Sequence, residues 1–165
     1  MDERDLQMFL DANGIYAKIF RLERKTKTVE QAVMALQTSK DKIIKTLTFI
    51  DESGEPILAI VTGEDTVNLK KLAKGIDTIG VRMATPTEVK SHSGYSVGGV
   101  PPVGHKVKIR TVIDTKVMRK KIVYGGGGSD NSLLEIRPWD IESLQDATVK
   151  SINMKSAVSL QEDPT

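Results

Sequence analysis

The segment GYSVGGVPPVG, residues 94–104, constrains the fold of this 165-residue chain more than any other. It holds four glycines and two prolines in eleven positions. Proline has no backbone N–H and glycine has no side chain to favour a regular conformation, so the segment predicts neither a helix nor a regular strand. We expect a stiff, irregular loop between the elements on either side.

Apolar periodicity and turn residues predict the elements before this loop. Two capping boxes, Thr28 with Gln31 and Thr85 with Glu88, mark helix starts because each pair satisfies backbone donors. The run 56–63 is apolar on both faces and is expected to be a central strand. In chain order we expect a helix over 3–13, a strand over 15–22, a helix from 28, strands over 43–50 and 56–63, a helix over 68–74, a strand over 79–83 and a short helix from 85.

Three strands and one helix are expected after the loop. The strands cover 106–114, 120–124 and 133–136, and the helix begins at Pro138. Strands and helices do not alternate strictly, so their order predicts the α+β class with a mixed, curled sheet. We expect one domain over residues 1–155 and a frayed tail over 156–165.

Composition excludes several classes of protein. The chain has no cysteine and two histidines, which leaves no disulfide framework, thiol nucleophile or cysteine-ligated metal. No apolar run approaches the ~20 residues of a membrane helix, and the acidic start MDERDLQMF does not resemble a signal peptide. We therefore expect no membrane contact and a cytoplasmic location. A net charge of +2 argues against bulk nucleic-acid binding and leaves room for a local RNA-binding patch.

Lys45 is the first candidate site residue. Strand alternation places its side chain on the more apolar face of its strand, with Leu47 and Phe49. Thr46 and Thr48 lie on the other face. A lysine in this position can line a pocket mouth with its stem packed and its ammonium exposed. The alternative is a lysine at a strand end whose ammonium simply reaches water.

Two glycine-rich segments are candidates for binding a ligand through the backbone. In 94–104, glycines permit close approach, and prolines hold N–H groups in place to stabilise charge on an ester oxygen. The glycines 125–128 lie between two apolar strands, and no Lys-Ser or Lys-Thr follows them, so they form no Walker phosphate loop. The alternatives are a structural crossover for the first segment and a flexible hairpin connection for the second.

Basic and acidic residues complete the candidates. Lys106, Lys108 and Arg110 alternate along a predicted strand and would share one face, to which the basic run 119–121 could add. Such a face could contact a phosphate backbone, or it could simply be solvated. Asp114 ends a strand and could point toward the loop or cap a turn. Neither histidine has the sequence context of a catalytic triad or a metal site.

These segments together resemble the YbaK/prolyl-tRNA synthetase editing-domain family of aminoacyl-tRNA deacylases. The resemblance runs from about residue 3 to residue 147. The motifs that carry it stand in the family's order: Lys45-Thr46-Leu47 for its K-T-L strand entry, GYSVGGVPPVGH around its G-x-x-x-P loop, TVID ending at Asp114 for its T-x-I-D strand, and IVYGGGGSDNSLLEI for its glycine-rich connection.

The resemblance implies a twisted mixed β-barrel surrounded by helices. It also implies an enzyme that clears wrong amino acids from tRNA, often tRNA(Pro), as an insertion in prolyl-tRNA synthetase or as a free-standing protein. This chain resembles the free-standing branch. The implied reaction needs no metal or other cofactor: a water, a ribose hydroxyl or the substrate's own side chain attacks the ester. A small wrong amino acid such as alanine or cysteine would be selected by pocket size.

The resemblance also implies roles for individual residues. Lys45 would bind the phosphate of the 3′-terminal nucleotide, and backbone N–H groups from Gly98 to Pro102 would hold the aminoacyl carbonyl. The catalytic set is Lys45, Gly98, Gly99, Val100 and Pro102; the substrate-binding set is Thr28, Tyr95, Pro101, Asp114, Gly126, Gly127 and Gly128; the tRNA contacts are Lys106, Lys108 and Arg110.

One departure from the family pattern leaves the amino acid open. Some bacterial members have an acidic residue where this sequence has Leu133-Leu134, and Asp130 is a nearby candidate to replace it. An alternative function is a non-catalytic module of the same fold that binds a nucleotide or a tRNA end. A third is an interaction domain that docks on an aminoacyl-tRNA synthetase. None of these expectations involves DNA.

Overall fold

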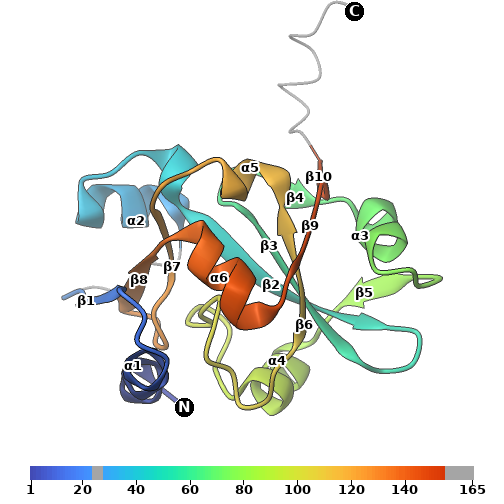
Figure 1. Cartoon of the computed structure of the whole chain (residues 1–165), viewed down its shortest axis with the longest axis horizontal. Coiled ribbons are helices and arrows are strands. Elements are labelled where there is room, and N and C mark those ends of the chain that lie inside the picture. The colour runs from blue at the N-terminus through green and yellow to red at the C-terminus, as the bar shows by residue number, and fades with distance from the viewer. Residues whose placement is uncertain (24–27, 155–165) are drawn as a thin grey trace, which may run out of the picture.

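The structure is a computed structural model that describes residues 1–23 and 28–154 (Figure 1). The predicted tail over 156–165 lies outside the described residues. The helices are α1 (Glu3–Ala12), α2 (Val29–Leu36), the 3₁₀ helix η1 (Lys40–Lys42), α3 (Leu69–Gly75), α4 (Pro86–Ser93), α5 (Thr115–Met118) and α6 (Pro138–Gln145). The strands are β1 (Lys18–Arg21), β2 (Ile44–Asp51), β3 (Pro56–Thr62), β4 (Thr66–Val67), β5 (Val81–Met83), β6 (Arg110–Asp114), β7 (Val123–Gly126), β8 (Ser132–Ile136), β9 (Thr148–Lys150) and β10 (Asn153–Met154).

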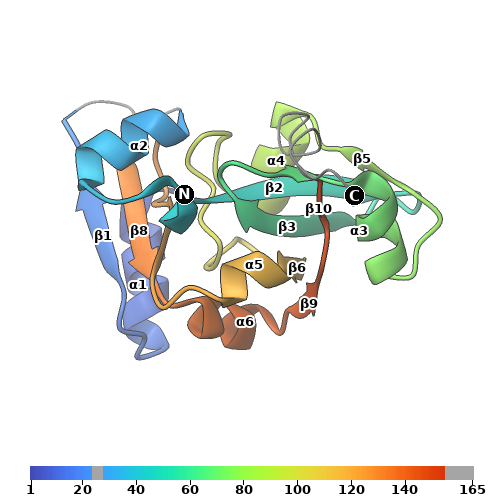
Figure 2. The same ribbon diagram turned by 90° about the horizontal axis from the view of Figure 1, so that it is seen from above.

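The described strands form three sheets, of which the largest has the order β5-β2-β3-β6-β9. The β2–β3 and β2–β5 pairs are antiparallel, whereas β3–β6 and β6–β9 are parallel. A three-stranded antiparallel sheet, β1-β8-β7, lies at one end of the molecule, and β10 pairs with β4 (Figure 2). The mixed sheet and interspersed helices confirm the predicted α+β class.

β3 is buried on both of its faces, as its apolar sequence predicts. Ile60 packs with Val117 of α5 and Ile141 of α6 in one cluster. Its neighbour Val61 points to the other face, where a second cluster includes Leu72 of α3. Each cluster removes apolar area from water at about 25 cal/mol per Å², so β3 anchors the sheet from which the neighbouring β2 is displayed.

Both predicted capping boxes are confirmed. Thr28 Oγ1 accepts a hydrogen bond of 3.2 Å from the Gln31 N–H at the start of α2. Thr85 Oγ1 accepts one of the same length from the Glu88 N–H at the start of α4. α4 then ends at Gly94, whose φ of +87° lies in the left-handed region that favours glycine. The predicted irregular loop begins at this residue.

Three strand predictions need correction. The strand expected over 106–114 begins only at Arg110, because the Lys106 N–H is bonded back to Ser93 at the end of α4. β1 is shorter than the predicted 15–22, and β7 starts at Val123 rather than at residue 120. The short strands β4, β9 and β10 were not predicted. In the described part of the chain, no helix is long and apolar enough to cross a membrane.

Candidate functional site

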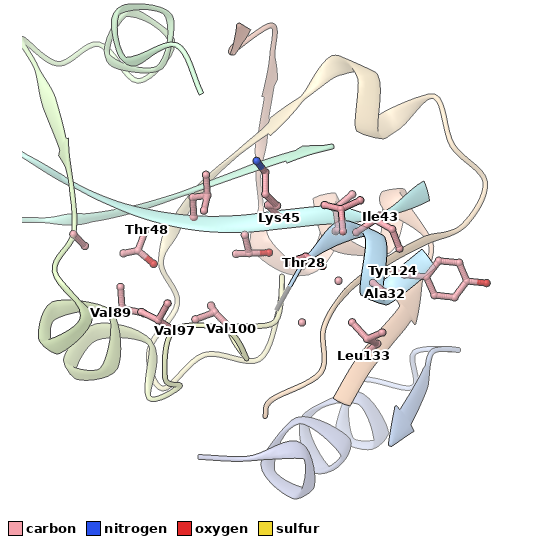
Figure 3. A pocket seen from close by; sticks show the side chains of 18 of the residues that line it. Thr28, Ala32, Ile43, Lys45, Thr48, Val89, Val97, Val100, Tyr124 and Leu133 are labelled. Carbon is pink, nitrogen blue, oxygen red and sulfur yellow. The ribbon is translucent and has the colours of Figure 1, made fainter. Parts of the chain in front are cut away.

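A cavity of about 480 Å³ opens beside β2 (Figure 3). Its volume falls within the usual range for small-molecule sites, and its walls are mostly apolar. Five parts of the chain supply the walls: α2 and the residue before it, β2, the segment from β5 into α4, the loop 94–104, and the strands β7 and β8. The lining is Thr28, Val29, Ala32, Ile43, Ile44, Lys45, Thr46, Leu47, Thr48, Met83, Ala84, Pro86, Val89, Val97, Gly98, Val100, Tyr124, Gly125, Gly126 and Leu133.

β2 presents different side chains to the two sides of the strand. Lys45 leaves β2 on the side opposite Thr48, while Thr48 lies on the side of Val97 and Val100 (Figure 3). The register agrees, since Lys45 pairs with Val61, which belongs to the cluster packed on α3. The lysine and the loop therefore lie on different sides of one strand and can contact different parts of a ligand.

Lys45 is half-buried at the edge of the cavity. Burial lowers the pKa of its ammonium below the ordinary lysine value, and the carboxylate of Asp65 opposes that change. Asp65 itself accepts hydrogen bonds from Thr62 Oγ1 at 2.8 Å and from Lys116 Nζ at 3.1 Å. Among the described residues, no carboxylate lies within ion-pair distance of Lys45. Its charge is therefore available to an anionic ligand.

The loop 94–104 is held in place from behind. Tyr95 is fully buried, and its hydroxyl donates to the Gly104 carbonyl at 3.2 Å. His105 Nε2 lies 2.7 Å from the Pro101 carbonyl oxygen and its ring meets that of Tyr95 edge-on. Burial lowers the pKa of His105 to about 4, so the imidazole is neutral at pH 7 and Nε2 donates.

Within the described residues, six backbone N–H groups of this loop lack a protein acceptor, those of Ser96, Val97, Gly98, Val100, Val103 and Gly104. Three of these residues line the cavity, namely Val97, Gly98 and Val100. The Gly99 N–H donates to the Ser96 carbonyl at 3.0 Å, and Pro101 and Pro102 have no N–H to offer. The donors available to a ligand carbonyl are therefore those of Val97, Gly98 and Val100, and only the last two belong to the predicted span from Gly98 to Pro102.

The predicted glycines serve mainly to pack one backbone against another. A Cβ on Gly126 would lie 2.2 Å from the Val100 carbonyl oxygen, and one on Gly99 would lie 2.9 Å from the Ser129 backbone. Gly127 and Gly128 approach other backbone segments in the same way and do not line the cavity. The glycines that form a wall of the cavity are therefore Gly125 and Gly126, and the prediction for Gly127 and Gly128 was wrong.

Two other predicted binding residues lie outside the cavity. Tyr95 is in the core behind the loop. Asp114 is fully buried, caps α5 and accepts hydrogen bonds from the backbone N–H groups of Lys116, Ile152 and Asn153. The Asn153 side-chain amide donates to Asp114 as well. Asp114 therefore caps α5 and holds the start of β10 in place. This is the turn-capping alternative that the sequence left open.

The predicted basic face does not exist as one strand face. Lys106 and Lys108 precede β6, and only Arg110 belongs to it. Arg110 pairs with Ile57 near the β2–β3 turn, whereas Lys45 pairs with Val61 at the opposite end of β3. The structure thus does not bring these three residues to Lys45. Asp130 lies in the β7–β8 connection and does not line the cavity.

Two hydroxyl groups in the cavity wall belong to residues that the sequence analysis did not propose as site residues. The Oγ1 atoms of Thr46 and Thr48 are buried and lack a hydrogen-bond partner within the described residues. Alternation along β2 places both on the face opposite Lys45, and this was the signal that could have identified them. In the parts of the chain that the structure describes, no three His, Cys, Asp or Glu side chains group in a way that could hold a metal ion.

The sequence profile of the aminoacyl-tRNA editing domain matches residues 23–144 of this chain. The chain belongs to the aminoacyl-tRNA editing domain family. This assignment confirms the resemblance seen in the sequence and the deacylase class that it implied. The matched range includes Lys45, the loop 94–104 and both strands that border the glycines.

Individual relatives of this editing domain agree. YwhH of Bacillus subtilis (strain 168), an uncharacterized protein, is 30% identical over 128 residues, which cover 76% of this chain and 80% of that protein. EbsC of Enterococcus faecalis, a candidate Cys-tRNA(Pro)/Cys-tRNA(Cys) deacylase, is 27% identical over 78% of each chain. A crystal structure of a candidate trans-editing enzyme for prolyl-tRNA synthetase superposes with a TM-score of 0.85 at 29% identity, covering 92% of this chain and 96% of that one.

Proposed function

We propose that this editing domain acts in trans to hydrolyse the ester bond between a small wrong amino acid and the 3′-terminal ribose of a tRNA. The relatives described as a Cys-tRNA(Pro)/Cys-tRNA(Cys) deacylase and as a trans-editing enzyme support this substrate class. We further propose tRNA(Pro) carrying alanine or cysteine as the first substrates to test. Action on a free aminoacyl-tRNA is consistent with the predicted cytoplasmic location.

One observation carries the proposal: a single cavity is bordered by Lys45 and by the free N–H groups of Gly98 and Val100. An aminoacyl-tRNA end presents a phosphate and an ester carbonyl close together, joined by one nucleoside. A lysine ammonium pairs with the phosphate, and backbone N–H groups accommodate the carbonyl. Since the two sets lie on different sides of β2, each can contact its own part of the same substrate.

The arrangement accounts for the chemistry without a protein nucleophile. Among the described residues, the cavity lining holds no carboxylate, imidazole or thiol, although several hydroxyls are present. A water or a substrate group attacks the carbonyl carbon, and the oxygen that becomes negative is stabilised by the Gly98 and Val100 N–H groups. The bond to the ribose oxygen then breaks and that oxygen takes up a proton. We propose that no metal is needed, because the walls offer no matching set of ligands.

The cavity walls also support selection by size. Val29, Ala32 and Leu133 form an apolar wall on the side of α2. An apolar pocket discriminates by only about 1–3 kcal/mol per methylene, so a larger side chain would be rejected by steric clash. Thr28, at the start of α2, borders the same region and is the predicted binding residue best placed to contact the substrate.

The test is a panel of tRNA(Pro) and matched tRNAs charged with Ala, Cys, Ser, Thr or Pro, each with and without EDTA. We expect fast hydrolysis of one or two small wrong amino acids, no hydrolysis of Pro-tRNA(Pro), and no effect of EDTA. Saturable binding of these tRNAs without turnover on any charged species would contradict the proposal. It would favour the non-catalytic binding module instead.

A further inference from the structure

Two basic segments lie next in sequence to residues that line the cavity. Lys42 directly precedes Ile43, which lines the cavity, and the run 116–121 leads into Tyr124, which also lines it. In this region basic residues outnumber acidic ones. The basic residues are Lys40, Lys42, Lys45, Lys116, Arg119, Lys120 and Lys121, and the acidic residues are Asp41, Glu64, Asp65 and Glu135.

Two contacts show that these segments adjoin. Lys120 Nζ forms an ion pair with Asp41 of η1 at 2.8 Å. Directly beyond it, Ile43 and Tyr124 form an isolated parallel β-bridge. The chain entering β2 and the chain entering β7 therefore run side by side, and α5 lies along the same edge of the molecule (Figure 1).

Asp65 connects this surface to Lys45. Its carboxylate pairs with Lys116 Nζ of α5 at 3.1 Å and is the charge that acts on Lys45. Lys45 and Lys116 thus both interact with one carboxylate, that of Asp65. Lys42, Arg119 and Lys121 are exposed and form no ion pair with another described residue.

We infer that Lys42, Lys116, Arg119 and Lys121 form a binding surface for the phosphate backbone of the RNA stem whose 3′ end enters the cavity. This inference rests on the proposed function, because that function places the 3′ end beside Lys45. Several cations spaced along one edge can contact successive phosphates, as expected for an electrostatic, sequence-independent contact. The surface replaces the one predicted from Lys106, Lys108 and Arg110, which the structure places elsewhere.

The cavity geometry supports a surface on this side. Val97 and Val100 of the loop lie on the side of β2 opposite to Lys45 (Figure 3), where the proposed function places the acyl group. A substrate bound to both the loop and Lys45 must pass across the edge of β2. The nucleotides that precede the terminal one then continue from Lys45 toward α5 and η1.

The experiment compares two double variants that each remove one arginine and one lysine charge. Arg119→Gln with Lys121→Gln changes the proposed surface. Lys108→Gln with Arg110→Gln changes exposed residues at the other end of the sheet. Each protein is titrated with an uncharged RNA hairpin of the acceptor stem ending in CCA, at several salt concentrations. Hydrolysis of an alanyl ester of adenosine, which has no stem, is measured in parallel.

We expect the first variant to bind the hairpin about tenfold more weakly and to lose about two from the slope of log K against log salt. The second variant should match the wild type, and all three proteins should hydrolyse the adenosine ester equally. Equal weakening by both variants, or weakening by the second alone, would overturn the inference. If the wild type binds the hairpin but hydrolyses no ester, the proposed function fails while the binding comparison still decides the surface.

Discussion

The Gly128 N–H donates a hydrogen bond of 2.9 Å to the carbonyl oxygen of Gly99, which ties the β7–β8 connection to the cavity loop. The two segments lie so close that Gly126 has no room for a side chain beside Val100. We predict that Gly126→Ala displaces the loop and lowers the deacylation rate at least about tenfold. Overpacking of this kind typically lowers the free energy of unfolding by about 1–3 kcal/mol, and urea denaturation of the variant would measure that loss.

Gly80→Ala is the matched control, because a Cβ at Gly80 meets nothing within 4 Å and its φ is not in the left-handed region. It should leave both rate and stability unchanged. An active, fully stable Gly126→Ala protein would show that the loop need not sit against β7.

Asp65→Asn should change the pH dependence of deacylation. The Asp65 carboxylate raises the pKa of Lys45 against the lowering effect of burial, so its loss lowers that pKa further. Lys45 is charged only below its pKa, so activity should decline at a lower pH in the variant than in the wild type. The measurement is kcat/KM against pH, after subtraction of spontaneous ester hydrolysis.

Glu64→Gln removes the same charge from the adjacent, exposed position and should leave the alkaline limb in place. If the alkaline limb of Asp65→Asn is unchanged or moves to higher pH, the Asp65 carboxylate does not raise the pKa of Lys45.

His105 should make stability fall in mild acid. Its folded-state pKa of about 4 lies below the unfolded value near 6.5, so the unfolded chain binds more protons between these limits. Stability from this residue is complete above pH 6.5 and declines as the pH falls, by about 2 kcal/mol at pH 5. We predict this decline in urea unfolding of the wild type and its absence in His105→Gln, which retains a donor for Pro101.

His92→Gln, which replaces the other histidine, should unfold with the pH dependence of the wild type. If His105→Gln also follows the wild-type curve, the imidazole titrates normally and does not depend on burial behind the loop.

Asp114→Ala should destabilise the protein without changing substrate affinity in the folded fraction. The substitution removes the acceptor of the Ile152 and Asn153 N–H groups, of which the former is buried. Unsatisfied buried donors cost about 1–3 kcal/mol each, so we expect a loss of about 3 kcal/mol in urea unfolding. The exposed Asp11→Ala should stay within about 0.5 kcal/mol of the wild type. A stable Asp114→Ala protein with a raised KM would return Asp114 to the substrate-binding set.

Local rules predicted the parts of the fold that depend on neighbouring residues. The boxes at Thr28 and Thr85 determine helix starts by contacts within four residues, so the sequence identifies them directly. The apolar run of β3 predicts a central strand because burial on both faces leaves no polar alternation. The short strands β4, β9 and β10 depend on pairing between distant segments, and two or three residues show no readable period.

The sequence identified the segments that form the site, but not which residues of those segments face the cavity. Lys45 and the loop 94–104 do border one cavity. Tyr95 and Asp114, in contrast, are buried in the core, and Gly127 packs against the backbone of β8. Glycine looks the same in sequence whether a ligand or a neighbouring backbone occupies the space beside it. Lys106 is not part of the predicted strand, because its N–H donates to the carbonyl oxygen of Ser93, thirteen residues earlier. The alternating sequence pattern gives no sign of that contact.

The most direct test of the account is single-turnover hydrolysis of the best mischarged tRNA by Lys45→Ala, with Lys74→Ala as the control. Lys74 is an exposed lysine of α3 that does not line the cavity. We predict a rate at least about 100-fold lower for Lys45→Ala, with wild-type circular dichroism, because the 3′ end loses the charge that positions it. Lys74→Ala should match the wild type. Wild-type hydrolysis by a folded Lys45→Ala protein would contradict the central claim.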